Sequence, residues 1–139
     1  MVSYEGKAIT RASPDAVFAA WTNVAGWSKG THVKSASIDG EFRVGAVIRT
    51  KAVGFPSSTL SVTRVEPPLL WVDESRAFGM HLTFEHVIES GSAATLLIER
   101  VIITGPLARL VGPLLRRRME ALFVASTAEI AAQAEGRTE

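Results

Sequence analysis

Hydrophobic and polar residues follow two different spacings along this chain of 139 residues. Between residues 32 and 103 they tend to alternate, and short stretches rich in Gly, Pro, Asp and Ser interrupt the alternation. Alternation is typical of β-strands, because successive side chains point to opposite faces of a sheet. Together with a looser alternation near the N-terminus, the pattern predicts these strands: Val2–Thr10, His32–Ile38, Ala46–Val53, Thr59–Val65, Leu69–Arg76, Met80–Glu89 and Ala93–Ile103.

The C-terminal segment shows helical spacing instead. Apolar residues recur every three or four positions from Leu107 to Ile130, with arginines and glutamates between them. This spacing predicts a long amphipathic helix whose apolar stripe needs a broad surface, and the predicted sheet supplies one. We expect Thr104 to cap its first turn and Pro106 to occupy its first position. Pro113 is expected to bend or break the helix, because proline removes one internal hydrogen bond.

Two short helices are predicted between the first and second strands. Ser13 can cap a helix that begins at Pro14 and carries Trp21 on its apolar side. A second short helix or turn is expected over Asn23–Lys29, anchored by Trp27. Helices this short are stable only when they pack, so both tryptophan side chains should point inward.

The order of predicted elements defines a fold class. One strand, two small helices, about six further antiparallel strands and a long helix make an α+β arrangement with the helices on one face of the sheet. The sheet is expected to be curved, since its last two strands are longer than usual. The length suits a single domain, expected over residues 1–135, with a frayed tail at residues 136–139.

Composition narrows the classes of function. Fifteen basic and fourteen acidic residues nearly balance, so nothing global points to nucleic acid as a partner. There is no cysteine, and His32, His81 and His86 lack a metal-ligand spacing, so we expect no metal and no cofactor. No apolar run is long enough to span a membrane, and the N-terminus shows no targeting segment. We therefore expect a cytoplasmic protein that is a monomer or a homodimer.

Four local sequences, in this order and spacing, carry a resemblance to a known family. They are Ala12-Ser13-Pro14-Asp15-Ala16-Val17-Phe18 leading to Trp21 and Trp27, then Phe42-Arg43-Val44-Gly45, then Arg64-Val65-Glu66-Pro67-Pro68, and finally Ile103-Thr104-Gly105-Pro106-Leu107-Ala108. Over nearly its whole length the chain resembles the polyketide cyclase/dehydrase-like branch of the START-related (SRPBCC) superfamily, which also contains the plant Bet v 1-type proteins. The resemblance implies a helix-grip fold, in which a curved antiparallel sheet closes around the C-terminal helix and leaves an apolar cavity. The family shares no single catalytic constellation, so the resemblance implies architecture more than chemistry.

His86 and Glu99 are the polar candidates for such a cavity. On the strand before Gly91, alternation places one set on the face expected to be buried: Met80, Leu82, Phe84 and His86. On the next strand both faces are mostly apolar, so the pattern leaves its inward face open. Members of the family often carry a polar cavity residue six positions before this Gly-Pro, which is Glu99 here. A turn near Gly91 would place it opposite the 84–86 region.

Each candidate residue has a functional and a structural interpretation. His86 and Glu99 could orient a ligand hydroxyl or carbonyl, or act as base and acid, but they could also face solvent or only satisfy each other. The apolar candidates could enclose a ligand or form an ordinary core. These ligand-contact candidates are Trp21, Trp27, Trp71, Met80, Leu82, Phe84, Leu97, Met119, Leu122, Phe123 and Ser126.

Several further residues are placed around the cavity or outside it. Phe55 and Phe78 lie in turns that could form a lip over the opening. Arg49, Asp73 and Arg100 are expected on the convex, wet side of the sheet, as second-line candidates. The run 116–118 of three arginines fans around a helix, so a solvated face is expected rather than a focused anion site.

Three hypotheses for the function follow. The first is binding of a small hydrophobic ligand, aromatic and polyketide-like or lipid-like, between sheet and helix. The second is a polyketide cyclase or dehydratase-type enzyme that uses His86 and Glu99 for proton transfer. The third is a non-enzymatic ligand-sensing or protein-interaction module, which a collapsed cavity and an exposed apolar patch would favour.

Overall fold

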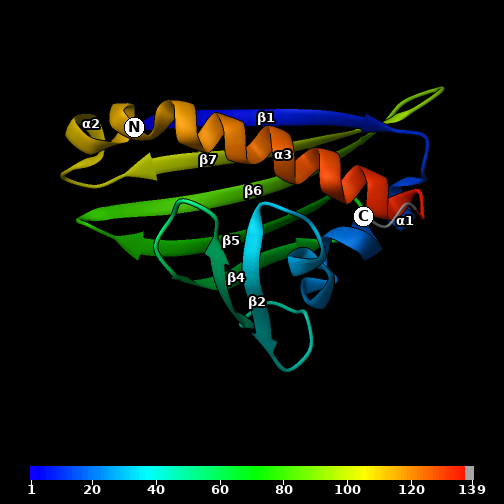
Figure 1. The fold of residues 1–139 in the computed structure, drawn as a ribbon, viewed down its shortest axis with the longest axis horizontal. Coiled ribbons are helices and arrows are strands. Elements are labelled where there is room, and N and C mark those ends of the chain that lie inside the picture. Colours follow the sequence, from blue (N-terminus) through cyan, green and yellow to red (C-terminus); the bar gives the residue numbers. More distant parts are fainter. Residues whose placement is uncertain (137–139) are drawn as a thin grey trace.

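The protein folds as a seven-stranded antiparallel sheet with a long C-terminal helix across its concave face, as shown by a computed structural model that describes residues 1–136 (Figure 1). The strands lie in the order β1-β7-β6-β5-β4-β3-β2. Their bounds are β1 Val2–Thr10, β2 Val33–Asp39, β3 Val47–Ala52, β4 Ser58–Glu66, β5 Leu70–Ala77, β6 Met80–Ser90 and β7 Thr95–Thr104. The predicted α+β class and strand number are confirmed. The predicted tail, residues 136–139, lies outside the described residues except for Gly136.

Five helical segments accompany the sheet in the described part of the chain. They are α1 Pro14–Trp21, η1 Val24–Lys29, α2 Ala108–Val111, η2 Gly112–Leu115 and α3 Arg116–Ala134, where η denotes a 3-10 helix. The cap of α1 is the predicted one, because the Ser13 hydroxyl accepts a hydrogen bond from the amide of Ala16 at 3.1 Å. Trp21 is buried, and Trp27 is half-buried with its indole nitrogen donating to the carbonyl of Trp21.

The C-terminal helix begins later than predicted. Thr104 is the last residue of β7, and α2 starts at Ala108 with Leu107 before it and no side-chain cap. The predicted cap is wrong because the chain uses this stretch to turn away from the sheet. Gly105 has φ +108°, and an added Cβ there would lie 2.8 Å from the carbonyl oxygen of Gly79. The break predicted at Pro113 is confirmed, since the 3-10 turn η2 separates α2 from α3.

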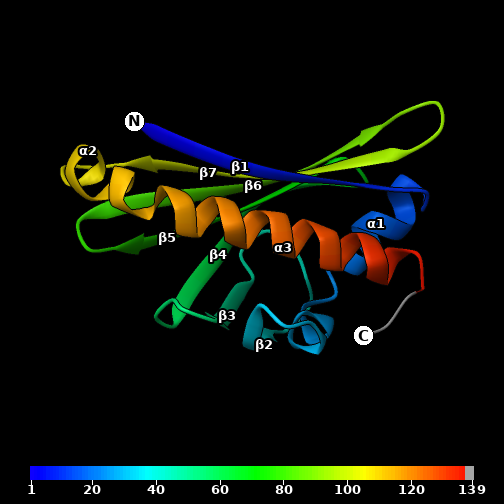
Figure 2. The same ribbon diagram turned by 45° about the horizontal axis from the view of Figure 1, so that its top comes forward.

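Helix α3 lies against β1 and crosses the sheet, as Figure 2 shows. The contact is closest at Gly6, where an added Cβ would lie 2.7 Å from the Cβ atom and backbone carbon of Phe123. The buried face of α3 consists of Met119, Phe123, Thr127, Ile130 and Ala131. The N-terminal part of the predicted stripe joins it only in part: Leu110 and Leu114 of α2 and η2 are exposed, whereas Val111 and Leu115 are half-buried against the same core cluster.

Candidate functional site

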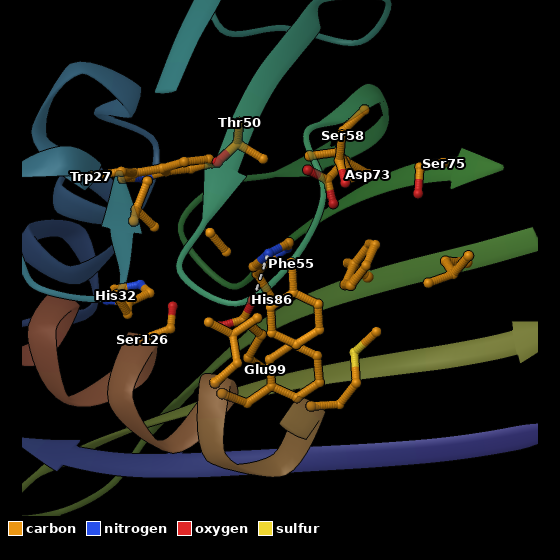
Figure 3. A pocket seen from close by; sticks show the side chains of 18 of the residues that line it. Trp27, His32, Thr50, Phe55, Ser58, Asp73, Ser75, His86, Glu99 and Ser126 are labelled. Atoms are coloured by element: carbon orange, nitrogen blue, oxygen red, sulfur yellow. Dashed lines mark ion pairs between the residues drawn. The ribbon is translucent and has the colours of Figure 1, made fainter. Parts of the chain in front are cut away.

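A cavity of about 360 Å³ lies between the sheet and α3. Its walls come from α1 and η1, the inner faces of β2 to β7, and the helical segments α2, η2 and α3. Alternation turns every second side chain of each strand toward α3. On β6 the inward set is the predicted one, Met80, Leu82, Phe84 and His86. The lining is mainly apolar, and a few polar groups converge within it (Figure 3). This combination is typical of small-molecule sites.

Most of the predicted ligand-contact residues line this cavity. Those that do are Trp21, Trp27, Met80, Leu82, Phe84, Met119, Leu122, Phe123 and Ser126. Trp71 and Leu97 are not among the lining residues, although both are fully buried. The ring of His86 stacks on Trp71 with 3.5 Å between centroids and separates it from the space. Leu97 lies near the start of β7, where it packs in the core cluster with Val17.

His86 and Glu99 face each other in the cavity wall, as the dashed line in Figure 3 marks. They are directly paired in the register of β6 and β7, and His86 Nε2 lies 3.7 Å from Glu99 Oε2. His86 Nδ1 lies 3.1 Å from the carbonyl oxygen of Trp71. A carbonyl only accepts, so the proton of the neutral ring sits on Nδ1, and the lone pair of Nε2 points toward Glu99.

Burial sets the protonation of this pair. It lowers the pKa of His86 to about 3, with the hydrogen bond to Trp71 opposing the shift, so the imidazole is neutral near pH 7. Burial also raises the pKa of Glu99 to about 7, opposed by a hydrogen bond with Ser126. Glu99 therefore exchanges a proton near neutral pH, beside a neutral imidazole that can accept a hydrogen bond from the protonated carboxyl.

Asp73 also lines the cavity, which corrects its predicted place on the wet side of the sheet. Only 2% of its surface is exposed, and its Oδ1 atom has no hydrogen-bond partner in the protein. Burial raises the pKa of Asp73 well above its ordinary value, and the charge of Glu99 raises it further. The signal was present in the alternation of β5, because Trp71, Asp73 and Ser75 must share one face. An inward Trp71 therefore implied an inward Asp73.

The other second-line candidates lie on the outer face of the sheet. Arg49 pairs with Asp39 at 2.7 Å. Arg100, next to Glu99 in sequence, binds Glu5 and Glu85 at 3.0 Å each. These placements agree with the prediction for the two arginines.

The rim of the cavity includes both predicted turns. Phe55 and Phe78 are among the lining residues, and Phe78 is 71% exposed with φ +54°, an uncommon conformation for a residue other than glycine. Arg118 of α3 donates to the carbonyl of Gly54 and lies 5.3 Å above the ring of Phe55. This arginine therefore links the 53–57 loop to the helix, while all three arginines of the 116–118 run are exposed, as expected.

Comparisons with solved structures place this architecture among known ones. The di-domain ARO/CYC protein StfQ of the steffimycin biosynthetic pathway matches with a TM-score of 0.78 at 13% identity, over 97% of this chain and 51% of that one. Ara h 8.0201 matches with a TM-score of 0.69 at 14% identity, over 94% and 98% of the two chains. The chain has the Bet v 1-like helix-grip fold. A point mutant of norcoclaurine synthase from Thalictrum flavum, in complex with a transition-state analogue, shares this helix-grip fold with a TM-score of 0.73 at 12% identity, over 96% of each chain.

At these identities the comparisons establish the fold of the chain, and the chain spans about half the length of StfQ. No family model matches the sequence, and no curated protein is detectably similar to it. Among residues 1–136, none of the helices combines the length and apolar character needed to cross a membrane. The same residues hold no group of three or more His, Asp or Glu side chains arranged to bind a metal ion.

Proposed function

We propose that this protein binds a small, mainly apolar molecule, with an aromatic or lipid-like skeleton, in the cavity between the sheet and α3. The observation that carries the proposal is an open, apolar cavity of about 360 Å³ inside a fully formed sheet and helix. A protein of this size normally fills its interior to near crystal density, and an apolar void costs stability. A ligand that occupies the void recovers those contacts. The protein-interaction form of the third hypothesis is less well supported, since a collapsed cavity would have favoured it and the cavity is open.

To test this proposal, a larger side chain is introduced on α3 so that it occupies the cavity. Leu122 lines the space, so Leu122→Trp should occupy much of it, whereas Ala121→Trp adds the same ring to the exposed side of the same turn. A neutral naphthalene dye should bind the wild type and Ala121→Trp with enhanced fluorescence and should lose at least about tenfold in affinity for Leu122→Trp. Equal binding by all three proteins would contradict the proposal. Native mass spectrometry followed by organic extraction of the freshly purified protein should identify a carried ligand.

A second candidate function is proton transfer by His86 and Glu99. It is favoured by one observation: a carboxyl whose pKa is about 7 faces the free lone pair of a neutral imidazole inside an apolar cavity. Glu99 is the better matched base and acid near neutral pH, and His86 would position its proton. In deuterium oxide, an enolisable aryl ketone should exchange its α-protons faster with the wild type than with Glu99→Gln. Identical exchange rates for the two proteins would exclude this activity for that probe.

The cytoplasmic location and the monomeric or homodimeric state remain predictions from the sequence. Size-exclusion chromatography with light scattering tests the second of these directly.

A further inference from the structure

The cavity wall carries three carboxyl groups, and its described lining residues include no lysine or arginine to balance them. The carboxyl groups are those of Asp73, Glu99 and Glu129, and the lining also includes the imidazoles of His32 and His86. Glu129 is engaged by His32, whose Nδ1 contacts its carboxylate. One oxygen of Asp73 and one of Glu99 are buried without a hydrogen-bond partner in the protein. Such groups are costly in a folded protein, so they call for a partner that the chain itself does not supply.

Asp73 and Glu99 point into the same hollow from strands on either side of β6 (Figure 3). Asp73 pairs with Phe84, which pairs with Val101, and Glu99 lies two residues before Val101 on β7. Two strand spacings and two residues separate their backbones by roughly 12 Å. Their side chains converge on the concave face, and each is within the electrostatic reach of the other, since Glu99 raises the pKa of Asp73.

We propose that the ligand of this cavity carries a basic amine, which binds as an ammonium group at Asp73 within the field of Glu99. This inference rests on the proposed ligand-binding function and narrows the class of ligand. Asp73 is the anchor because it is the more deeply buried of the two and has no side-chain partner, whereas Glu99 has Ser126 and His86 beside it. The apolar skeleton of the ligand then lies among aromatic rings such as Trp27 and Phe84.

Three classes of ligand head group can be ranked by their interaction with this wall. A hydroxyl group satisfies one carboxyl oxygen and leaves Asp73 in the neutral form that burial favours. An ammonium group donates charge-assisted hydrogen bonds and offsets both the burial cost and the charge of Glu99 when Asp73 ionises. A carboxylate adds a further negative charge to a wall without lysine or arginine, and it therefore binds worst. Free fatty acids are accordingly excluded, whereas aromatic or aliphatic amines are accepted.

Binding of an amine at Asp73 should release a proton, which can be measured. Burial raises the pKa of Asp73 and so favours its protonated form in the free cavity, whereas an ammonium group stabilises the ionised form. The complex therefore forms with release of the carboxyl proton to the buffer, while the ligand keeps its own proton. The other titratable groups near Asp73 are Glu99 on β7, His86 on β6 and Glu74 on its own strand. A hydroxyl ligand releases no proton, because it leaves the carboxyl neutral.

The experiment uses three probes with one skeleton: naphthylethylamine, naphthylethanol and naphthylacetic acid. Isothermal titration at one neutral pH, in two buffers of different ionisation enthalpy, measures the affinity and the number of protons released. We expect the amine to bind about tenfold more tightly than the alcohol, the acid to bind worst, and only the amine to release a proton. Asp73→Asn should remove the preference and most of the proton release, leaving only the fraction that the ammonium group draws from Glu99, while keeping the affinity for the alcohol within about twofold.

Asp39→Asn is the matched control, because it neutralises an exposed aspartate that pairs with Arg49 on the outer face. It should behave like the wild type, and Glu99→Gln should weaken amine binding less than Asp73→Asn. If the alcohol binds but the amine has no advantage, or if Asp73→Asn keeps the advantage, the inference is wrong and the proposed function stands. If none of the three probes binds, the proposed function is wrong as well. Thermal unfolding of each variant verifies that it is folded.

Discussion

The two faces of strands β5, β6 and β7 treat their charged residues in opposite ways. On the outer face Glu74 pairs with His81 at 2.6 Å, and Arg100 pairs with Glu5 and Glu85. Asp73 is next to Glu74 in sequence, and Glu99 is next to Arg100, but both point to the inner face. There, each keeps one oxygen atom without a hydrogen-bond partner.

The buried carboxyl groups on the inner face therefore lower the stability of the folded protein, whereas the paired charges on the outer face have little effect on it. Charged groups on a surface interact weakly and cost little, whereas a buried carboxyl without a partner destabilises the folded state. Stability alone would have replaced the inner carboxyls with apolar residues. Their presence in a cavity wall is the pattern expected of a site whose stability is given up for binding or chemistry.

The largest expected effect is on how the free energy of unfolding decreases at acidic pH. It compares His86, on the inner face of the sheet, with His81, on the outer face. His86 has its pKa lowered from 6.5 to about 3 in the folded state, so the unfolded chain binds a proton first as the pH falls. The free energy of unfolding therefore has its full value, as far as His86 is concerned, above pH 6.5. It decreases by about 5 kcal/mol as the pH falls from 6.5 to about 3.

Urea unfolding of His86→Phe at a series of pH values should show a shallower acid slope than that of the wild type. Loss of the hydrogen bond to Trp71 changes the absolute stability of the variant but not this slope. His81→Phe on the outer face is the control and should keep the slope of the wild type. An unchanged slope in His86→Phe would mean that the folded protein accepts a charged imidazole at this position.

The second effect is a decrease in the free energy of unfolding as the pH rises, opposite in direction to the effect of His86. It compares Glu99, on the inner face, with Glu85, on the outer face. Because the pKa of Glu99 is raised from 4.5 to about 7, the folded state holds its proton longer than the unfolded chain. Stability is full below pH 4.5 and falls by about 3 kcal/mol as the pH rises through about 7. Glu99→Gln should lack this fall, whereas Glu85→Gln should retain it. Carboxyl carbon shifts in NMR report the titration directly, and an ordinary midpoint for Glu99 would refute the prediction.

The smallest effect lies on the outer face. Arg100→Met should lower the free energy of unfolding by roughly 1 kcal/mol, because its two ion pairs are partly exposed and such pairs are weak. Added salt should shrink the difference between variant and wild type, since it screens exposed charges. Urea unfolding at low and high salt measures this. A difference that is independent of salt would show that packing of the arginine stem, rather than charge, is responsible.

The sequence was sufficient for the fold because local signals and global pattern agreed. Alternation located the seven strands, Ser13 and Pro14 located the first helix, and Pro113 located the break in the last one. The start of the C-terminal helix was misplaced because Thr104 looks like a cap only if the preceding strand ends earlier. A tertiary contact of Gly105 with the β5–β6 turn decided that boundary.

The candidate site was less predictable, because a charged residue is predicted to be exposed unless the residues two positions away on the same strand are considered. Asp73 was assigned to the wet side for this reason, although its alternation with Trp71 pointed inward. Glu99 could not be oriented from its own strand, where both faces are apolar, and its position was implied only by the family resemblance. Trp71 and Leu97 show a further limit, since the pattern distinguishes inward from outward but not cavity wall from the layer behind it.

The close approach at Gly6 has a consequence for redesign of the pocket. The helix is anchored on β1, where even a methyl group on Gly6 would collide with Phe123, while the hollow lies against β2 to β7. Anchoring and recognition are thus assigned to different strands. A library that varies positions such as Leu60, Leu82 and Leu122 could change the size of accepted ligands while the scaffold keeps its geometry, provided that Gly6 is left untouched.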